Sequence, residues 1–510
     1  MYLCRDFYKI SNYLILKRIP IKEINRLAFP ALVSGIIEPM ISLTDTIMAG
    51  HIKENTKDIL GAVGIVSSFI TALVWIFIQG SKAISAQISY AYGQNRLQQM
   101  RGLVAQVLSL SLVISVGCAL ITYLFTDFVL KDLYKAEKGL LENGLIYFRI
   151  RVWGLPLTFL TLAIHNIFRG LQNTSWAMYT GILSGITNLV LDYLFVFVFD
   201  WNIRGLAWAS LLAQAIMLST SVYLLYTKTP FRFQRTRRWH PDFMKNTRMS
   251  LDLFLRSLMM QATLYFSYYA ATRLGGGKES TIVATHTVLN QVWLFSVFLF
   301  DGFCSAGGVL SGRLYSSEQF ASIRYMIRDL FFIVTGIGLG VALIYFTLYI
   351  QIGEWLTKDA DIRRLFYQTF WIVVLMQPIN AVTFLFDGFY KGLGFTKTLR
   401  NAFLIATFLG FFPIYYFVEY AYHWGLMGIW VSPAGMDVLS WGHTQFITKF
   451  FLLLIKVGSL RLDKKSKTHE KYSYTYGGVF LRSGCLPQEC CHCGGVLGQK
   501  QIPPLPYPYC

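Results

Sequence analysis

Long apolar runs constrain this chain more than any other feature of its sequence. Eleven runs are about 20 residues long, the helix length needed to cross a hydrocarbon layer of about 30 Å. They fall at 27–50, 59–82, 102–126, 145–168, 176–199, 205–226, 250–272, 281–310, 329–352, 366–390 and 399–420. Only 14% of the residues are charged, against roughly 25% in soluble domains. The pattern argues against a soluble enzyme, a nucleic-acid-binding domain and a disordered scaffold, and it predicts an all-α integral membrane protein.

The net charge of +19 is unevenly distributed. Lys and Arg are concentrated in residues 1–26 and in the connections that an even number of spans separates from this segment, which therefore lie on the same side of the membrane. The most basic of these connections is 227–248. Cytoplasmic loops carry such an excess, so we expect a cytoplasmic N-terminus and interpret the charge as an orientation signal rather than as a nucleic-acid site. The expected location is the plasma membrane (the bacterial inner membrane), which the chain would cross many times. We expect the chain to be a monomer.

The sequence repeats itself at an offset of 222 residues. The segment FRGLQNT at 168–174 is similar to YKGLGFT at 390–396, and the same offset aligns residues elsewhere. These further pairs are Gly80 with Gly302, Trp208 with Trp430, and Ser210 with Ser432. An even number of spans separates the two copies, so both have the same orientation, as in transporters built from parallel repeats.

Two pseudo-symmetric six-helix bundles follow from this repeat. The expected divisions are a cytoplasmic segment at 1–26, a first bundle at 27–226, a basic cytoplasmic linker at 227–248, a second bundle at 249–432 and an atypical tail at 433–510. Substrate would bind between the bundles, and access would alternate as they rock against each other.

Ionisable residues within the spans are candidate functional residues, because burying them in a membrane is costly. Glu38 and Asp45 are seven residues apart in the first span and therefore share a helix face. We expect Pro30 and Pro39 to interrupt that helix, and Pro39 to free a backbone carbonyl for a cation or proton site. The alternative for both acids is a structural or interfacial carboxylate.

A second polar group lies in the fifth and sixth predicted spans. Asn188 and Asp192 are four residues apart on one helix face, and Ser210 adds a hydroxyl from the next span. Such oxygen ligands suit Na⁺ or a proton. The alternative is that these residues join helices by hydrogen bonds.

The second bundle lacks this set of residues. The repeat places Ser267 opposite Asp45 and Ile414 opposite Asp192. We therefore expect the coupling chemistry to belong to the first bundle.

Other charged residues within the spans are accessory candidates. Asp387 precedes Lys391 by four residues, a spacing typical of a helix-end salt bridge, while Asp301 has no such neighbour in sequence. Lys82 either extends its ammonium group to the cytoplasmic interface or neutralises a carboxylate.

Signatures of catalysis are missing from the sequence. No Walker motif, nucleophile–base pair or metal triad is visible, so we expect neither an enzyme nor an ATP-driven transporter. His165 and His286 stand alone, which is typical of core or cavity histidines. Aromatic residues make up 16% of the chain, and some could line a cavity for cationic amphiphiles through cation–π contacts.

Five segments within about residues 20–432 resemble a known family. They are PALVSGIIEPMISLTDTIMAGH in the first span, FRGLQNT after the fourth, ITNLVLDY in the fifth, GLAWAS opening the sixth, and FDGFYKGLGFT near the end of the tenth. Together they resemble the multidrug and toxic compound extrusion (MATE) transporters, nearest the DinF-like branch. The resemblance implies twelve helices in two six-helix lobes and export driven by a Na⁺ or H⁺ gradient.

The resemblance also implies which residues couple transport to the cation. By motif, the family's first-lobe cation site falls on Asp45, Asn188, Asp192 and Ser210. If the cation is Na⁺, the ligands among these are Asp45, Asn188 and Asp192. Asn166 aligns loosely with a further polar position of the fourth span. Some members use a second-lobe carboxylate instead, but the matching position here is Asn380, which argues against that variant.

The C-terminal tail departs from the family pattern. Relatives continue past GLMGIW with an apolar twelfth helix, whereas here the pattern stops near Ser432. The tail instead contains CLPQECCHC, which lacks paired zinc-ligand spacing. We interpret this tail as the product of a shifted reading frame, which predicts that another frame of the coding sequence restores the helix.

These observations predict a secondary antiporter without a cofactor. It would export organic compounds, cationic or amphiphilic, in exchange for Na⁺ or H⁺, with its twelfth helix degraded. The alternative is a lipid-linked oligosaccharide flippase of a related two-bundle plan, which would need basic residues in its cavity to hold a diphosphate.

Overall fold

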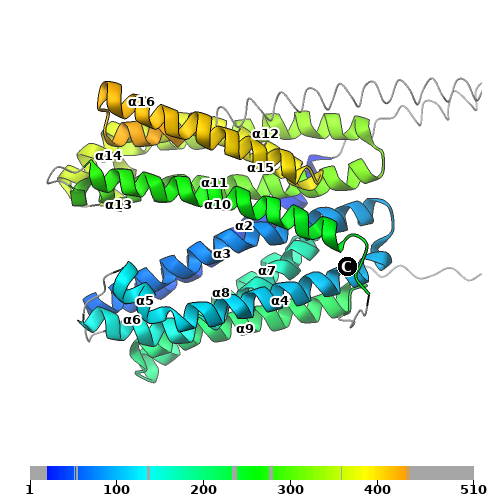
Figure 1. Cartoon of the computed structure of the whole chain (residues 1–510), viewed down its shortest axis with the longest axis horizontal. Helices are drawn as coiled ribbons and strands as arrows, with labels where there is room; N and C mark the ends of the chain where they lie inside the picture. The colour runs from blue at the N-terminus through cyan, green and yellow to red at the C-terminus, as the bar shows by residue number, and fades with distance from the viewer. Residues whose placement is uncertain are drawn as a thin grey trace, which may run out of the picture. The chain divides into compact units, whose positions relative to one another are not determined.

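A computed structural model describes residues 20–50, 52, 56–134, 138–232, 238–274, 279–357, 359–433 and 435. All of them belong to the first of two structural units, Met1–Phe450 and Phe451–Cys510. The described residues form helices and connections with no strand among them, as the apolar runs predicted (Figure 1).

Seven longer helices make up the described part of the first repeat. They are α2 (Ile21–Gly50), α3 (Thr56–Gly93), α4 (Arg101–Leu124), α6 (Lys138–Arg151), α7 (Gly154–Gly170), α8 (Ser175–Tyr193) and α9 (Asn202–Lys228). A short helix, α5 (Thr126–Phe128), follows α4, and a π-helical segment, η3 (Leu194–Val198), extends α8.

The second repeat has a matching order of helices. They are α10 (Phe243–Arg273), α11 (Glu279–Ser316), α12 (Phe320–Thr347), α13 (Tyr349–Leu356), α14 (Ala360–Gly392), α15 (Thr396–Ile405) and α16 (Phe412–Tyr422). The π-helical segment η4 (Ala406–Phe411) joins α15 to α16.

The helix ends preserve the repeat offset found in the sequence. Helices α2 and α10 begin 222 residues apart, and α7 and α14 end 222 residues apart, at Gly170 and Gly392. Helices α3 and α11 both have 38 residues. The two segments α6 and α7 together correspond to the continuous helix α14.

Eight helices of the described residues are long and apolar enough to cross a membrane, and a bent pair raises the number to nine. That pair is α6 and α7, which meet at an angle of 44°. The other two predicted runs, 27–50 and 250–272, lie in α2 and α10, which have 30 and 31 residues but are not among the nine. The chain is therefore an all-α, multi-pass membrane protein.

Helix α2 differs from its prediction in one respect. It runs without interruption from Ile21 to Gly50, so neither Pro30 nor Pro39 ends it. Membrane helices tolerate such prolines because neighbouring groups and local backbone adjustments satisfy the freed carbonyls. A broken first helix is therefore not part of this fold.

Close backbone contact joins α11 to α14. A Cβ atom on Gly308 would come within 2.6 Å of the Gly388 carbonyl oxygen, and one on Gly392 would meet the carbonyl of Gly308. Gly388 and Gly392 are four residues apart, which is the spacing by which small residues let membrane helices approach. No larger side chain fits here unless the two helices separate.

This packing predicts that Gly388→Ala destabilises the protein. Its new methyl group would meet backbone atoms of Cys304, and overpacking of this kind costs about 1–3 kcal/mol. Thermal unfolding in detergent should show a lower melting temperature. Gly336→Ala in α12 is the control, because a Cβ atom there meets nothing within 4 Å. Equal melting temperatures for the two variants would show that the contact is loose.

The counterpart of α9 in the second repeat is described only at its start. Residues 426–433 are helical, Trp430 and Ser432 are buried, and the Ser432 hydroxyl donates to the Gly428 carbonyl over 2.9 Å. The predictions of a degraded twelfth helix and a shifted reading frame concern residues that lie, beyond Gly435, outside the described part of the chain.

Candidate functional site

Three helices of the first repeat bring the four predicted coupling residues together. Asp45 comes from α2, Asn188 and Asp192 from α8, and Ser210 from α9, and each is at most 1% exposed. The Ser210 hydroxyl donates to Asp45 Oδ2 over 2.8 Å, and the Asn188 amide donates to Asp45 Oδ1 over 3.3 Å. Asp45 is therefore held in place by donors from two neighbouring helices.

Asp192 is the least satisfied member of this cluster. Its carboxyl group interacts with that of Asp45, yet neither of its oxygens accepts a hydrogen bond from the described residues. The side-chain oxygen of Asn188, one helical turn earlier, has no donor among them either. A buried carboxylate without donors is costly, so these oxygens are suited to receive a proton or a metal cation.

Sequence reasoning missed two further members of the cluster, both on α6. The Tyr147 hydroxyl donates to Asp45 Oδ2 over 3.3 Å, and Arg151 Nη2 lies 3.7 Å from the same oxygen. Both side chains are buried, and Arg151 Nε and Nη1 have no hydrogen-bond partner within the described ranges. The cluster thus combines two carboxylates with one guanidinium group.

The local fold explains how Arg151 reaches a buried site. It is the last residue of α6, at the 44° bend before α7. Arg151 falls within the predicted span 145–168 but was not among the candidates. Tyr147 and Arg151 are spaced i, i+4 and share a helix face, and this spacing is the signal that could have identified them. A cavity of about 70 Å³ borders the cluster and is lined by Arg151 and Ser210, which is room for a few waters.

The accessory candidates lie elsewhere. Lys82 Nζ is 3.3 Å from Asp301 Oδ1, which links α3 of one repeat to α11 of the other. Asp387 lies between Arg256 Nη2, at 2.7 Å, and Lys391 Nζ, at 2.5 Å.

The amide and carboxylate candidates outside these ion pairs do not join the cluster either. Asn166 donates to the Ser81 hydroxyl over 2.7 Å and lines a cavity with Lys82 rather than with Asp45. Asn380 is buried in α14. The Glu38 side chain lies outside the described part of the structure.

Comparison with known proteins identifies the family. The MatE family model matches residues 30–194 and 257–416, one match in each repeat. The chain belongs to the MatE family. The MatE members are transporters and not enzymes, so this chain is a membrane transporter, in agreement with the sequence.

Individual relatives support the same assignment. Protein DETOXIFICATION 44, chloroplastic, of Arabidopsis thaliana is 24% identical over 80% of this chain and 78% of its own length. DNA damage-inducible protein F of Escherichia coli (strain K12) is 25% identical over 76% of this chain and 83% of its own. A solved outward-facing multidrug resistance MATE family transporter of the MOP superfamily has the same fold, with a TM-score of 0.75 and 19% identity over 86% of this chain and 98% of that one.

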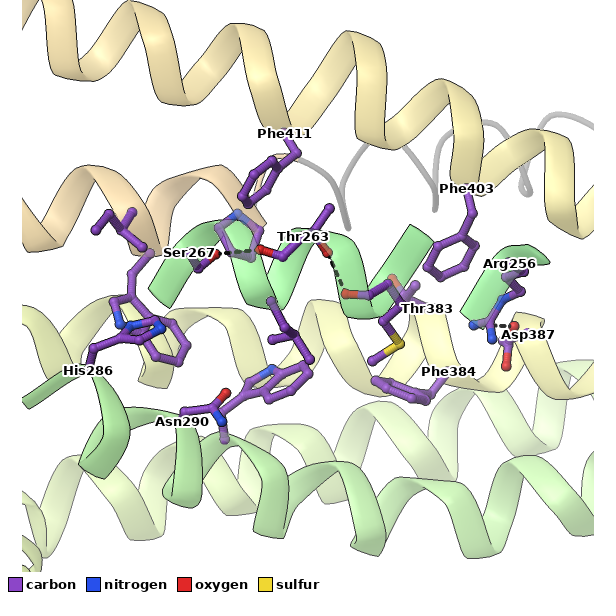
Figure 2. Close-up of a pocket in the computed structure, with 16 residues that line it drawn as sticks. Arg256, Thr263, Ser267, His286, Asn290, Thr383, Phe384, Asp387, Phe403 and Phe411 are labelled. Atoms are coloured by element: carbon purple, nitrogen blue, oxygen red, sulfur yellow. Dashed lines mark hydrogen bonds and ion pairs between the residues drawn. The ribbon is translucent and has the colours of Figure 1, made fainter. Parts of the chain in front are cut away.

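The two MatE repeats contain cavities at equivalent places, and the carboxylate pair lies beside the cavity of the first repeat. The second repeat's cavity, of about 60 Å³, is lined by aromatic rings and by Arg256 and Asp387, which Figure 2 shows side by side below Phe403. The Arg256 guanidinium carbon lies 4.0 Å from the Phe403 ring centroid. At the position equivalent to Asp45, Ser267 donates to the Thr263 carbonyl over 2.9 Å.

The two histidines of the MatE repeats occupy buried positions. His165 Nε2 lies 2.9 Å from the Thr180 hydroxyl and 3.2 Å from that of Ser221. His286 lines the cavity of Figure 2 and packs edge-on against Tyr268, with 4.5 Å between ring centroids. Both environments match the core or cavity histidines expected from the sequence.

Proposed function

We propose that this chain is a secondary antiporter that exports organic compounds in exchange for Na⁺ or H⁺. The observation that carries the proposal is the Asp192 carboxylate, which is buried beside Asp45 with no hydrogen-bond donor among the described residues. Like-charged carboxylates at one buried site cannot easily both remain ionised and uncompensated. The pair therefore favours uptake of one monovalent cation.

The charges of the cluster indicate how binding and release could be balanced. Asp45 and Asp192 carry two negative charges when ionised, and Arg151 supplies one positive charge. One proton or one Na⁺ completes neutrality. For Na⁺, the available ligands are oxygens of Asp45, Asp192 and Asn188.

Arg151 acts in this proposal as a tethered cation. Its guanidinium group is close enough to Asp45 to weaken the binding of any second cation. It thereby keeps the site from holding its ion too tightly for release. Because Arg151 also lines the adjacent cavity, its side chain has space to withdraw when an ion enters.

Ion uptake is coupled to substrate through helix α2. This helix carries Asp45 and packs against α8 within its own repeat and against α11 of the other repeat. A cation that draws α2 toward α8 therefore changes the contact between the repeats, where substrate would bind. Such coupling is reciprocal, so substrate must also alter the affinity for the cation.

Polar contacts join the repeats near the start of α2. Arg313 Nη2 of the second repeat lies 2.9 Å from Glu23 Oε1 of the first, and Arg313 Nη1 donates to Gln172 of the first repeat over 2.6 Å. The charge distribution of the loops supports placing this end in the cytoplasm. In an alternating-access cycle these contacts must break when the chain opens inward.

Arg313→Gln should therefore make the cytoplasmic side open more often. The side chains of this ion pair are each about three-quarters buried, and such a pair contributes up to about 1 kcal/mol. Cys304 is buried in a cavity between the repeats. We therefore expect Cys304 to react roughly threefold faster in the variant. The measurement is alkylation of Cys304 by an impermeant maleimide, followed by peptide mass spectrometry. Arg324→Gln, at an exposed position of α12, is the control. Unchanged alkylation of Cys304 would count against a closing role for the pair.

The proposed function is tested with the full chain in proteoliposomes. An imposed Na⁺ or H⁺ gradient should drive accumulation of an aromatic organic probe. Comparing the two gradients identifies the coupling ion. If neither gradient drives accumulation of a cationic, an anionic or a neutral aromatic probe, the antiport proposal is wrong.

A lipid-linked oligosaccharide flippase is the second candidate function. The observation that favours it is the presence of Lys82 and Arg169 in a cavity between the repeats, where they could hold a diphosphate. A flippase would move a diphosphate-linked lipid across vesicles without a Na⁺ or H⁺ gradient, whereas the antiporter would depend on one.

We further propose that the chain works as a monomer in the plasma membrane, the bacterial inner membrane, with its N-terminus in the cytoplasm. The excess of Lys and Arg on the N-terminal side of the membrane supports this orientation.

A further inference from the structure

A cavity rich in basic residues lies where α3, α7, α11 and α14 meet. Its volume is about 50 Å³, and both repeats contribute to it. Its charged and amide lining consists of Lys82, Asn166, Arg169, Asp301, Asp387 and Lys391. In the antiporter proposed above, this place between the repeats is where the exported compound would bind.

The two acidic residues of this cavity are already paired with bases. Asp301 accepts from Lys82 over 3.3 Å. Asp387 lies between Arg256 and Lys391, at 2.7 and 2.5 Å. Neither carboxylate is therefore available to neutralise a cationic compound without first losing an existing partner.

Arg169 is left over after these pairs are counted. It is 9% exposed, it lines the cavity, and its Nε has no hydrogen-bond partner among the described residues. With Arg256 included, there are four basic side chains and two acidic ones. The bases are Lys82, Arg169, Arg256 and Lys391, and the acids are Asp301 and Asp387. Asp301 interacts electrostatically with Arg169 as well as with Lys82, so one carboxylate serves both bases. An excess of buried positive charge is unfavourable, and a bound anion would offset it.

We propose that the cavity binds an anionic group, a carboxylate or a phosphate, of the exported compound. Arg169 is the main partner, because a guanidinium group pairs with either anion through two parallel hydrogen bonds, and Lys82 flanks it. This inference rests on the proposed export function and names its substrate class. It differs from the cationic compound that the sequence suggested.

The neighbouring cavity indicates what the anion is attached to. Asp387 lines both cavities, and Figure 2 shows it at one end of a pocket whose walls carry Phe384, Phe403 and Phe411. Aromatic walls favour an apolar or aromatic body. The substrate class is therefore an aromatic or apolar organic anion.

A pair of probes with one aromatic body and opposite charges tests this proposal. Radiolabelled naphthoate and naphthylmethylammonium are bound to the purified full chain in nanodiscs of phosphatidylcholine. We expect naphthoate to bind saturably and the ammonium compound not to compete. Arg169→Gln should weaken naphthoate binding by about tenfold or more, because it removes a charged hydrogen bond. Arg204→Gln, at an exposed position of α9, should have no effect.

Lys82→Gln is the second variant and keeps the test decisive if Arg169→Gln does not fold. It should also weaken naphthoate binding. Tighter binding of the ammonium compound than of naphthoate, or unchanged naphthoate affinity in both folded variants, would overturn the proposal.

Two further arms separate the source of the anion and the two proposals. The first arm repeats naphthoate binding in nanodiscs that contain phosphatidic acid. Suppressed binding would identify a lipid phosphate as the anion, whereas unaffected binding would identify a soluble compound. Either result upholds an anion site. Asp192→Asn should lose the response to Na⁺ or H⁺ but keep naphthoate binding, while Arg169→Gln should show the reverse. Failure of the anion proposal is thereby distinguished from failure of the antiport proposal.

Discussion

Asp192→Asn should strongly reduce cation-coupled export while leaving the protein as stable as before. The substitution preserves side-chain shape but removes one of the two buried charges, so the remaining Asp45 and Arg151 form a neutral pair with no need of a further cation. Coupling energies of about 1–3 kcal/mol correspond to 5–150-fold effects. Gradient-driven accumulation in proteoliposomes should therefore decrease by a factor within that range. The melting temperature should not decrease, because Asp192 has no donor among the described residues to lose.

Two other substitutions make this result interpretable. Asp132→Asn changes an exposed carboxylate of the same repeat and should leave accumulation unchanged. Asp45→Asn is a less clean test, since it removes the partner of buried Arg151, and breaking a buried pair costs about 3–5 kcal/mol. Full gradient-driven accumulation by a folded Asp192→Asn variant would exclude this carboxylate from coupling.

Arg151→Gln should make the site bind its cation more tightly and turn over more slowly. Two charges about 4 Å apart interact by about 4 kcal/mol at the effective dielectric of a protein. The guanidinium group of Arg151 lies 3.7 Å from Asp45. Its removal should therefore lower the half-saturating concentration of Na⁺ or H⁺ by at least about tenfold. The measurement is the cation dependence of intrinsic tryptophan fluorescence in the purified chain, together with the rate of accumulation in proteoliposomes.

Arg149→Gln is the matched control for Arg151→Gln. Arg149 is on the same helix, but its side chain is 51% exposed and pairs with Asp127 over 3.2 Å, so its removal should leave the cation dependence unchanged. If Arg151→Gln and the parent chain have the same half-saturating concentration, Arg151 does not act on the bound cation.

The four predicted coupling residues could be placed from the sequence, because local spacing and family motifs both point to them. Asn188 and Asp192 share a helix face at any reasonable register, and Asp45 is a conspicuous charge within an apolar run. The structure brings them together with Ser210, although their role in coupling stays a prediction.

Arg151 could not be placed in the same way. It lies within the predicted span 145–168, but no family motif marks it, and the bend between α6 and α7 that follows it could not be read from the sequence. The contact of Lys82 with Asp301 depends on how the two repeats pack, and so does the position of Arg169 beside them. No periodicity within one helix reports such contacts between distant segments. The continuous α2 was missed because membrane helices tolerate proline better than soluble helices do.

The number of cations that each chain takes up at the Asp45 and Asp192 pair is the most direct test of the account. It can be counted with radiolabelled Na⁺, or with a pH indicator in weakly buffered detergent solution, on the purified full chain. We expect uptake of one Na⁺ or one H⁺ per chain, which disappears in Asp192→Asn and persists in Asp132→Asn. Equal uptake by the Asp192→Asn variant and the parent chain would contradict this expectation.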